Sequence, residues 1–173
     1  MTPKEVRTVL AFYPTSRGFG FALFKGEQFL VDWGIKDIRL KDKNFFAIHL
    51  IKTLIERYSP EVLVIEDTTR KHSRRHERIR LLYTRIAAYA KTRRIAVCRF
   101  TRAEMHDHFG VHTKYAIAEA VARAVPMLAS RLPPKRKAWM SEDARQSLFD
   151  AVALGIVYFA RSSSAIKPDG DEG

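Results

Sequence analysis

Three carboxylates stand where this sequence could support metal or acid–base chemistry. Asp150 lies in the middle of the apolar run SLFDAVALGIVYFA, and Glu66 ends the apolar segment EVLVIE. Asp143 precedes Asp150 by seven residues, so on one helix the two side chains would lie about 20° apart. An ionised carboxylate that is buried without a partner is costly, and such groups are therefore paired, metal-bound or protonated. Asp150 in particular predicts a cation beside it.

Each of these acids also has a simpler interpretation. Asp143 could complement the dipole of a helix that Ser141 caps, and Asp150 could pair with an arginine from another element. Glu66 could be a solvated acid at a strand end. However, ligands gather at the carboxyl ends of strands in open α/β sheets, which favours a site at Glu66. Because side chains alternate along a strand, Glu66 and Asp67 should point to opposite faces.

The elements that must position these acids follow from hydrophobic periodicity. We expect an antiparallel meander of strands at 6–12, 19–24 and 27–34, further strands at 61–66 and 95–100, and helices at 44–58, 74–93, 112–128 and 141–160. This order predicts an α/β domain with a mixed sheet flanked by helices. We expect one domain over residues 1–162 and a flexible polar tail over 163–173.

The charge of the chain predicts a polyanionic partner. Lys and Arg number 31 against 19 Asp and Glu, a formal net charge of +12. Nucleic acid fits this excess because neutralising phosphates releases condensed counterions. Neither terminus has the basic amphipathic helix of a membrane-surface protein, and no apolar run is long enough for a membrane span. The N-terminus lacks the apolar core and small-residue cleavage site of a secretory signal, so we expect a cytoplasmic protein. The single Cys98 excludes an intramolecular disulfide and a Cys-rich zinc site.

Basic residues are concentrated in three segments that could contact phosphate. The segment RKHSRRHERIR contains one acid, Glu77, among many cations, which is unlike an ordinary solvated helix face. The candidate phosphate contacts are Arg17, Arg70, Lys71, Arg74, Arg75, Arg78, Lys135, Arg136 and Lys137. The segment HDHFGVH also brings three histidines together, but we expect a loop there, which does not favour a zinc site.

Four segments in this order resemble the RuvC family of Holliday-junction resolvases, within the RNase H-like superfamily. They are PTSRGFGFALF after the first strand, the strand end VIE, the helix start HTKYAIAEAV and the final helix SLFDAVALGI. The resemblance covers about residues 7–160 and implies a three-layer RNase H-like (RuvC-type) domain. It further implies that Lys114 lies near the substrate, that the segment after Glu66 meets the DNA backbone, and that the protein is a homodimer.

The resemblance also implies four metal-ligand positions, of which two are acidic here. Glu66 and Asp150 match family acids, whereas Tyr13 stands at the position of the bridging aspartate and Ser147 at another ligand position. A phenol with a pKa of about 10 is a poor ligand for Mg²⁺, which prefers carboxylates and water. Two-metal cleavage needs ions about 3.5–4 Å apart, so losing the bridging acid predicts an impaired site.

We therefore expect a nucleic-acid-binding protein that binds branched or structured DNA with an impaired two-metal site. The alternative is an active Mg²⁺- or Mn²⁺-dependent Holliday-junction endonuclease that acts in DNA recombination. In that case Glu66, Asp150 and Asp143 would be its catalytic residues and metal ligands, with Asp32 or Asp67 as further substitutes. Structured RNA is a second substrate class. A protein–protein adaptor that kept only the fold is disfavoured by the +12 charge.

Overall fold

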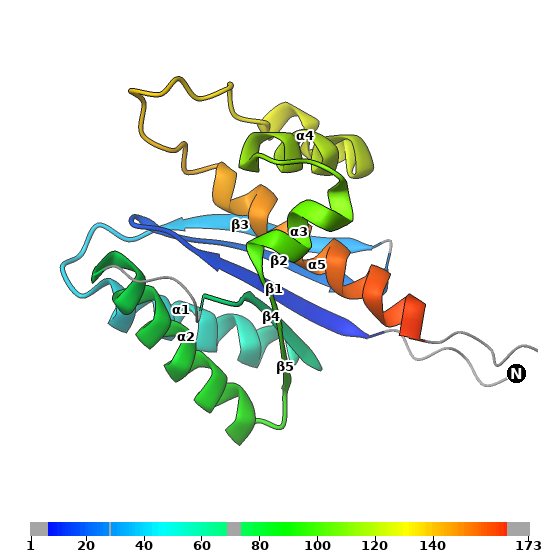
Figure 1. Ribbon diagram of the computed structural model, residues 1–173. Coiled ribbons are helices and arrows are strands. Elements are labelled where there is room, and N and C mark those ends of the chain that lie inside the picture. The colour runs from blue at the N-terminus through cyan, green and yellow to red at the C-terminus, as the bar shows by residue number, and fades with distance from the viewer. Residues whose placement is uncertain (1–6, 28, 69–73, 166–173) are drawn as a thin grey trace, which may run out of the picture.

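A five-stranded mixed sheet with helices on both faces forms the centre of the molecule (Figure 1). The computed structural model describes residues 7–27, 29–68 and 74–165. The strands are β1 (Thr8–Pro14), β2 (Gly18–Lys25), β3 (Leu30–Asp37), β4 (Val62–Glu66) and β5 (Ala96–Phe100). Their order across the sheet is β3-β2-β1-β4-β5. The predicted α/β class and mixed sheet are confirmed.

Strand β1 is central because it pairs with an antiparallel neighbour on one side and a parallel one on the other. It runs antiparallel to β2, with Tyr13 opposite Gly20, and parallel to β4, with Ala11 opposite Val64. Strands β2 and β3 continue the predicted meander, and β4 pairs with β5 in parallel. The carboxyl ends of β1, β4 and β5 therefore lie at one edge of the sheet.

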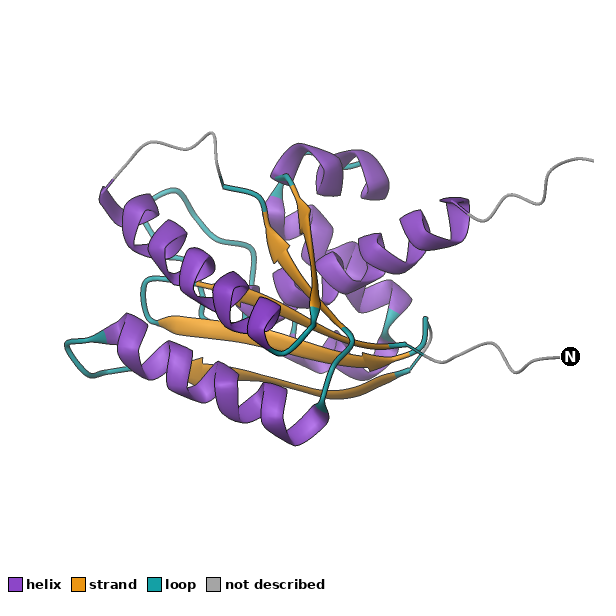
Figure 2. Cartoon of the chain, turned by 90° about the horizontal axis from the view of Figure 1, so that it is seen from below, coloured by secondary structure: helices purple, strands orange, loops and turns teal. Residues whose placement is uncertain are grey.

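The helices form a layer on each face of the sheet. They are α1 (Lys43–Tyr58), α2 (Arg74–Thr92), α3 (Arg102–Phe109), α4 (Lys114–Ala124), the short 3₁₀ helix η1 (Pro126–Arg131) and α5 (Gln146–Ala165). Helices α1 and α2 cover one face, which Figure 2 shows from below, and α3, α4 and α5 lie on the other. Each face buries its own apolar core, as a sheet covered on both sides requires.

Alternation along the strands places Tyr13 and Glu66 on the face that α5 covers. Val9, Ala11 and Tyr13 all belong to the core beneath α5, whereas Leu10 and Phe12 pack toward α1 and α2. In β4 the same alternation puts Val62 and Val64 under α5, so Glu66 points to that side as well. The alternation of side chains along each strand thus directs Tyr13 and Glu66 toward α5, the helix that carries Asp150.

Helix α5 approaches the sheet closely at Gly20. A Cβ atom at this position would stand 2.3 Å from the carbonyl oxygen of Ser147 and 2.6 Å from the amide nitrogen of Leu148. Only glycine leaves room for the first turn of α5 against β2. Because Gly20 is paired with Tyr13, this contact sets the height of α5 above the end of β1.

The last helix begins later than predicted. Ser141 does not cap it, and α5 starts at Gln146 after a turn at Ala144 and Arg145. The carboxylate of Asp143 accepts a hydrogen bond from the backbone N–H of Arg145 at 2.9 Å and so stabilises this turn. Asp143 therefore lies outside the helix, and the stripe predicted through Asp143, Ser147 and Asp150 is wrong in its first member.

Two other helix predictions need correction. The predicted helix over 112–128 ends at Ala124, and Pro126 begins η1 instead, because proline lacks the N–H that a continuing α-helix needs. The segment with His106 and His108, predicted to be a loop, forms α3. Thr101 caps α3 by accepting a hydrogen bond from the Glu104 N–H at 3.1 Å, and Gly110 ends it in the left-handed conformation.

The predicted boundary between domain and tail falls within a helix. Helix α5 continues through Ser162 to Ala165, and the rest of the predicted polar tail lies outside the described residues. Among the helices described, none combines the length and apolar character needed to cross a bilayer.

Candidate functional site

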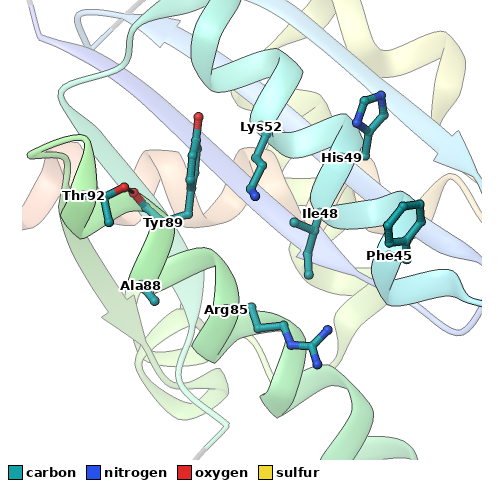
Figure 3. Close-up of a pocket in the computed structure, with 8 residues that line it drawn as sticks. All are labelled: Phe45, Ile48, His49, Lys52, Arg85, Ala88, Tyr89 and Thr92. Carbon is teal, nitrogen blue, oxygen red and sulfur yellow. Dashed lines mark hydrogen bonds between the residues drawn. The ribbon is translucent and has the colours of Figure 1, made fainter.

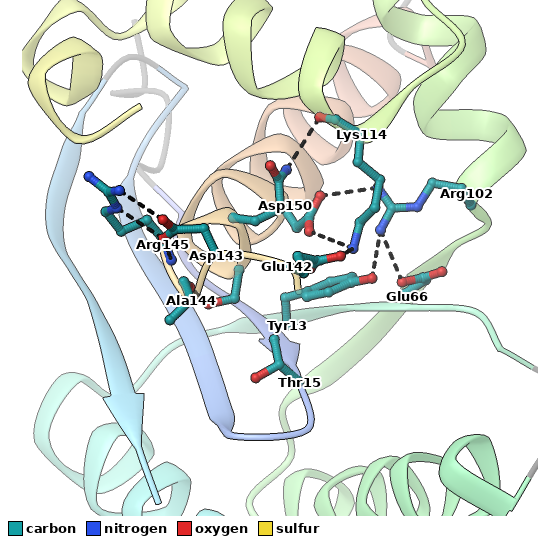
Figure 4. A network of polar contacts seen from close by, with 12 residues as sticks. Tyr13, Thr15, Glu66, Arg102, Lys114, Glu142, Asp143, Ala144, Arg145 and Asp150 are labelled. Carbon is teal, nitrogen blue, oxygen red and sulfur yellow. Dashed lines mark hydrogen bonds and ion pairs between the residues drawn. The ribbon is translucent and has the colours of Figure 1, made fainter. Parts of the chain in front are cut away.

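Five side chains from five elements meet at the carboxyl edge of the sheet (Figure 4). They are Tyr13 of β1, Glu66 of β4, Arg102 of α3, Lys114 of α4 and Asp150 of α5, and we call them the Arg102 network. Arg102 and Lys114 both stand in the first turn of their helices, after the N-caps Thr101 and Thr113. The two carboxylates predicted from the sequence are thus brought together, with two cations beside them.

The guanidinium of Arg102 connects three other members of the Arg102 network, Asp150, Tyr13 and Glu66. Its Nη1 donates to Asp150 Oδ1 at 3.1 Å, and its Nη2 donates to Tyr13 Oη at 2.7 Å. The same Nη2 lies 3.5 Å from Glu66 Oε2. The side chain of Arg102 is 16% exposed, whereas those of Glu66 and Asp150 are 3% and 0% exposed. Asp150 therefore has the arginine partner that the simpler interpretation of its position required.

Lys114 supplies a second cation to Asp150. Its ammonium lies 3.3 Å from Asp150 Oδ2, in an ion pair without hydrogen-bond geometry, and 3.0 Å from Glu142 Oε1. Gln146 holds the same segment by donating from Nε2 to the Lys114 carbonyl at 3.3 Å. Each oxygen of the Asp150 carboxylate thus faces a different cation.

Tyr13 fits between these two cations as a neutral aromatic group. The guanidinium carbon of Arg102 lies 5.3 Å from the centre of its ring and the Lys114 ammonium 5.0 Å, both within cation–π range. Burial raises the pKa of the Tyr13 phenol well above 10, and the negative charges of Asp150 and Glu66 raise it further. The phenol stays protonated at neutral pH and adds no charge to the site.

The charge of Arg102 is stabilised strongly. Burial alone would lower the pKa of its guanidinium, but the nearby Asp150, Tyr13 and Glu66 outweigh burial and raise that pKa above its usual value. Tyr83 of α2 also lies near Glu66, and burial followed by the Glu66 charge raises the pKa of its phenol. Glu66 and Asp150 thus face two positive side chains, Arg102 and Lys114, and two neutral phenols.

These residues do not fit a pair of divalent cations. Two carboxylates remain, and the guanidinium of Arg102 already binds both of them. A metal ion at this place would stand beside two fixed positive charges, without the bridging carboxylate that could offset them. Within the ranges that the structure describes, no cluster of three or more His, Cys, Asp or Glu side chains could hold a metal ion.

Asp143 and Ser147 are engaged elsewhere. Both oxygens of Asp143 bind the guanidinium of Arg145, at 2.9 and 2.7 Å, which lowers the pKa of that carboxyl. The hydroxyl of Ser147 donates to the Ala144 carbonyl at 2.8 Å. Figure 4 shows Asp143 and Arg145 to one side of the cluster. The structure does not bring Asp143 to Glu66 and Asp150, contrary to the ligand set predicted for an active enzyme.

The structure also places two further residues considered from the sequence, Asp32 as a substitute ligand and His106 as one of the three clustered histidines. Asp32 of β3 accepts a hydrogen bond from the Tyr58 hydroxyl at the end of α1, away from the Arg102 network. His106 lies in α3, and its pKa is lowered by burial and by the charges of Arg102 and His112. Neither residue joins the two carboxylates.

Several predicted phosphate contacts lie around the cluster. Arg17 is exposed in the β1–β2 turn and lies near enough to Asp143 to lower the pKa of that carboxyl. Lys135, Arg136 and Lys137 are exposed on the loop over residues 132–145. Arg78 of α2 instead supports the β1–β2 turn, by donating to the Thr15 carbonyl at 3.0 Å.

The other predicted phosphate contacts are Arg70, Lys71, Arg74, Arg75 and Lys114. Arg70 and Lys71 lie outside the described residues, and Arg74 and Arg75 begin α2. Lys114 was predicted to contact substrate, and its ammonium is engaged with Glu142 and Asp150. These assignments remain predictions.

A separate groove of about 570 Å³ lies between α1 and α2 (Figure 3). Its lining residues are Phe45, Ile48, His49, Lys52, Arg85, Ala88, Tyr89 and Thr92. Because α1 and α2 cover the opposite face of the sheet, this groove does not open onto the Arg102 network. None of the residues predicted as ligands or phosphate contacts lines it.

The sequence interpretation missed Arg102. Two local signals pointed to it: Thr101-x-x-Glu104 is the pattern of a helix start, and Arg102 directly follows strand β5. The carboxyl end of a strand next to β4 is where a side chain reaches Glu66. No local signal predicts the contact with Asp150, which is 48 positions away in the sequence.

Comparison with solved structures shows the RuvC-type, RNase H-like fold. The chain is similar to T. thermophilus RuvC in complex with a Holliday junction substrate, with a TM-score of 0.66, 12% identity and coverage of 91% of this chain and 97% of that one. It is also similar to the yeast mitochondrial Holliday junction resolvase Ydc2, with a TM-score of 0.55, 14% identity and coverage of 94% and 82%. The fowlpox virus Holliday junction resolvase gives a TM-score of 0.53, 13% identity and coverage of 89% and 99%. No protein-family model and no curated protein sequence matches the chain.

Proposed function

We propose that this protein binds branched DNA through its basic surface and does not cut it by two-metal catalysis. One observation carries the proposal: the guanidinium of Arg102 binds Tyr13, Glu66 and Asp150 at the place where the resemblance implies metal ions. The guanidinium of Arg102 pairs with the two carboxylates, but it cannot activate water or hold two metal ions at the spacing that two-metal cleavage needs.

The ion pairs of the Arg102 network support binding in the absence of metal. Glu66 and Asp150 both pair with Arg102, and Lys114 pairs with Asp150 and with Glu142 of the neighbouring loop. A phosphate backbone that approaches this edge therefore meets carboxylates that each already have a cation partner. In a site with free acids, divalent ions would have to screen that repulsion.

The exposed cations around the network provide the attraction. Arg17 and the loop cations Lys135, Arg136 and Lys137 are all exposed; Arg17 follows β1, and the loop leads into α5, which carries Asp150. Contacts of this kind position a nucleic acid without reading its sequence. Because two of the similar structures are Holliday junction resolvases and a third is RuvC in complex with a Holliday junction, branched DNA is the favoured ligand and structured RNA the second class.

The test compares binding and cleavage in the same reactions. The protein is incubated with a labelled four-way DNA junction and with a matched duplex, in about 5 mM Mg²⁺, about 5 mM Mn²⁺ or EDTA, at one fixed ionic strength. We expect a shift of the junction that is equal with and without divalent ions, and no nicks. Metal-dependent nicks that disappear in Asp150→Asn would overturn the proposal and favour the active endonuclease.

A charge variant tests the surface. The triple substitution Lys135→Gln, Arg136→Gln and Lys137→Gln should reduce the slope of log Kobs against log salt by up to about three, one for each phosphate that these side chains no longer neutralise. The matched control carries Lys52→Gln, Arg57→Gln and Lys91→Gln on the opposite face, with the same change of net charge. Equal losses in both variants would show that only overall charge matters.

The symmetry of a four-way junction also favours a twofold arrangement of the protein. A homodimer would present two copies of the exposed loop cations to the two symmetric halves of the junction. Sedimentation velocity of the free protein and of the complex measures this directly, and one monomer per junction would refute it.

A further inference from the structure

Trp139 is the most exposed large apolar side chain among the described residues. Its side chain is 80% exposed, and it stands on the loop over residues 132–145 that joins η1 to α5. Tryptophan is usually well buried, because exposing its large ring to water is unfavourable. An indole in this position is therefore available to a ligand.

The loop presents the indole together with positive charge. Lys137 lies over the ring, with its ammonium 5.8 Å from the ring centre, and the Met140 N–H donates to the Lys137 carbonyl at 3.0 Å. This hydrogen bond closes a turn around Trp139. The cation and the aromatic face thus belong to one small structural unit.

The free charge of this loop is positive. It contains four cations, Lys135, Arg136, Lys137 and Arg145, and two acids, Glu142 and Asp143. Both acids are in ion pairs, Glu142 with Lys114 at 3.0 Å and Asp143 with Arg145 at 2.7 Å. The three cations just before Trp139 are left exposed, which favours an anionic partner at this place.

The ion pair between Lys114 and Glu142 fixes where the end of the loop joins the domain. Lys114 contacts Glu142 of the loop and Asp150 of the network, so the loop is tied to the edge where we place the phosphate backbone. Combining exposed cations with an aromatic face is how proteins bind unpaired nucleotides, because phosphates meet the cations and bases stack on the ring.

We propose that Trp139 is a base-stacking residue that binds an unpaired or unstacked nucleobase of the nucleic-acid ligand. This inference rests on the proposed function and adds the part of the ligand that is recognised. Stacking is open to every base, so Trp139 selects unpaired strands and branch points over closed duplex without reading sequence. An anionic membrane is the less favoured partner, because Trp139 has one large exposed apolar neighbour in sequence, Met140, and the loop forms a turn there rather than an amphipathic helix with an apolar face.

The first measurement follows the indole itself. The chain contains two tryptophans, so Trp33→Phe leaves Trp139 as the sole tryptophan. Titration of this variant with an oligothymidylate single strand and with a four-way junction should quench its fluorescence, since a stacked base is a quencher. Binding without any change in fluorescence would overturn the proposal. A blue shift on vesicles of anionic phospholipid, without quenching by DNA, would also overturn it.

The second measurement compares affinities of variants. Trp139→Ala should weaken binding to the single strand by about 5- to 100-fold and binding to closed duplex by less than about 3-fold. Trp139→Phe should restore much of the loss, and Met140→Ala, a change of an exposed apolar neighbour, should have little effect. Equal losses on single strand and duplex would refute stacking.

The two proposals fail in different ways. If the wild-type protein binds none of these nucleic acids in low salt, the proposed function is wrong. If it binds the junction and Trp139→Ala binds as tightly as the wild type, only the assignment of Trp139 is wrong.

Discussion

Arg102→Ala takes one cation away from Glu66 and Asp150 while leaving both carboxylates buried. Breaking a buried ion pair in this way costs about 3–5 kcal/mol, because a charge is left without compensation. Lys114 remains 3.3 Å from Asp150 Oδ2, so part of the compensation survives. We therefore expect a loss near the lower end of that range, about 3 kcal/mol of unfolding free energy.

The expected shift is large enough for a simple assay. For a chain of this size, about 1 kcal/mol corresponds to about 2–4 °C in Tm, so Arg102→Ala should unfold about 6–12 °C below the wild type. Circular dichroism measures the Tm, and urea titration gives the free energy. Arg102→Lys should fall between the two proteins, since one ammonium cannot reach Tyr13, Glu66 and Asp150 together.

A matched substitution separates this effect from the loss of any arginine. Arg39 pairs with Asp37 at 3.1 Å, but its side chain is 90% exposed, so Arg39→Ala should change the stability by less than about 1 kcal/mol. If Arg102→Ala unfolds within about 2 °C of Arg39→Ala, the guanidinium does not compensate the buried carboxylates, and the proposed function loses its main support.

Two further predictions concern the same cluster. The double substitution Tyr13→Asp and Arg102→Ala should gain affinity for Mn²⁺, measured by calorimetry. Tyr13→Asp alone should not gain affinity, because the new carboxylate would pair with Arg102. Equal affinity for Mn²⁺ in the two variants would contradict this. Since the pKa of the Tyr13 phenol is raised by folding, its contribution to stability is complete below about pH 10 and is lost as the pH rises through the folded-state pKa. Urea midpoints should therefore fall less steeply above about pH 10 in Tyr13→Phe than in the wild type, and parallel pH profiles would refute the assignment.

The fold was predictable because its signals are local and repeated. Strand alternation, helical spacing and the order of four segments predicted the mixed sheet, and the same alternation explains why Tyr13 and Glu66 face α5. Helix ends were predicted less well. Pro126 and the side chain of Asp143 change the backbone over one or two residues, which hydrophobic periodicity does not resolve.

The centre of the candidate site could be predicted only in part. The sequence predicted a cation beside Asp150, because this acid lies within an apolar run, and it predicted Glu66 at the end of a strand. The identity of that cation depends on α3, whose eight residues are too few to show a clear helical period. Arg102 meets its partners 36, 48 and 89 positions away, and a single sequence gives no signal for contacts at those separations.

These long separations also bear on how the chain folds. The charges of the Arg102 network are compensated only when β1, β4, α3, α4 and α5 are all in place. A partly folded state that docks α5 on the sheet without α3 buries Asp150 without its guanidinium and is therefore high in energy. Such intermediates are depleted, so the sheet and the helices above it should fold and unfold as one cooperative unit. Because contacts this distant along the chain form slowly, we expect the contacts of the Arg102 network to form late in folding.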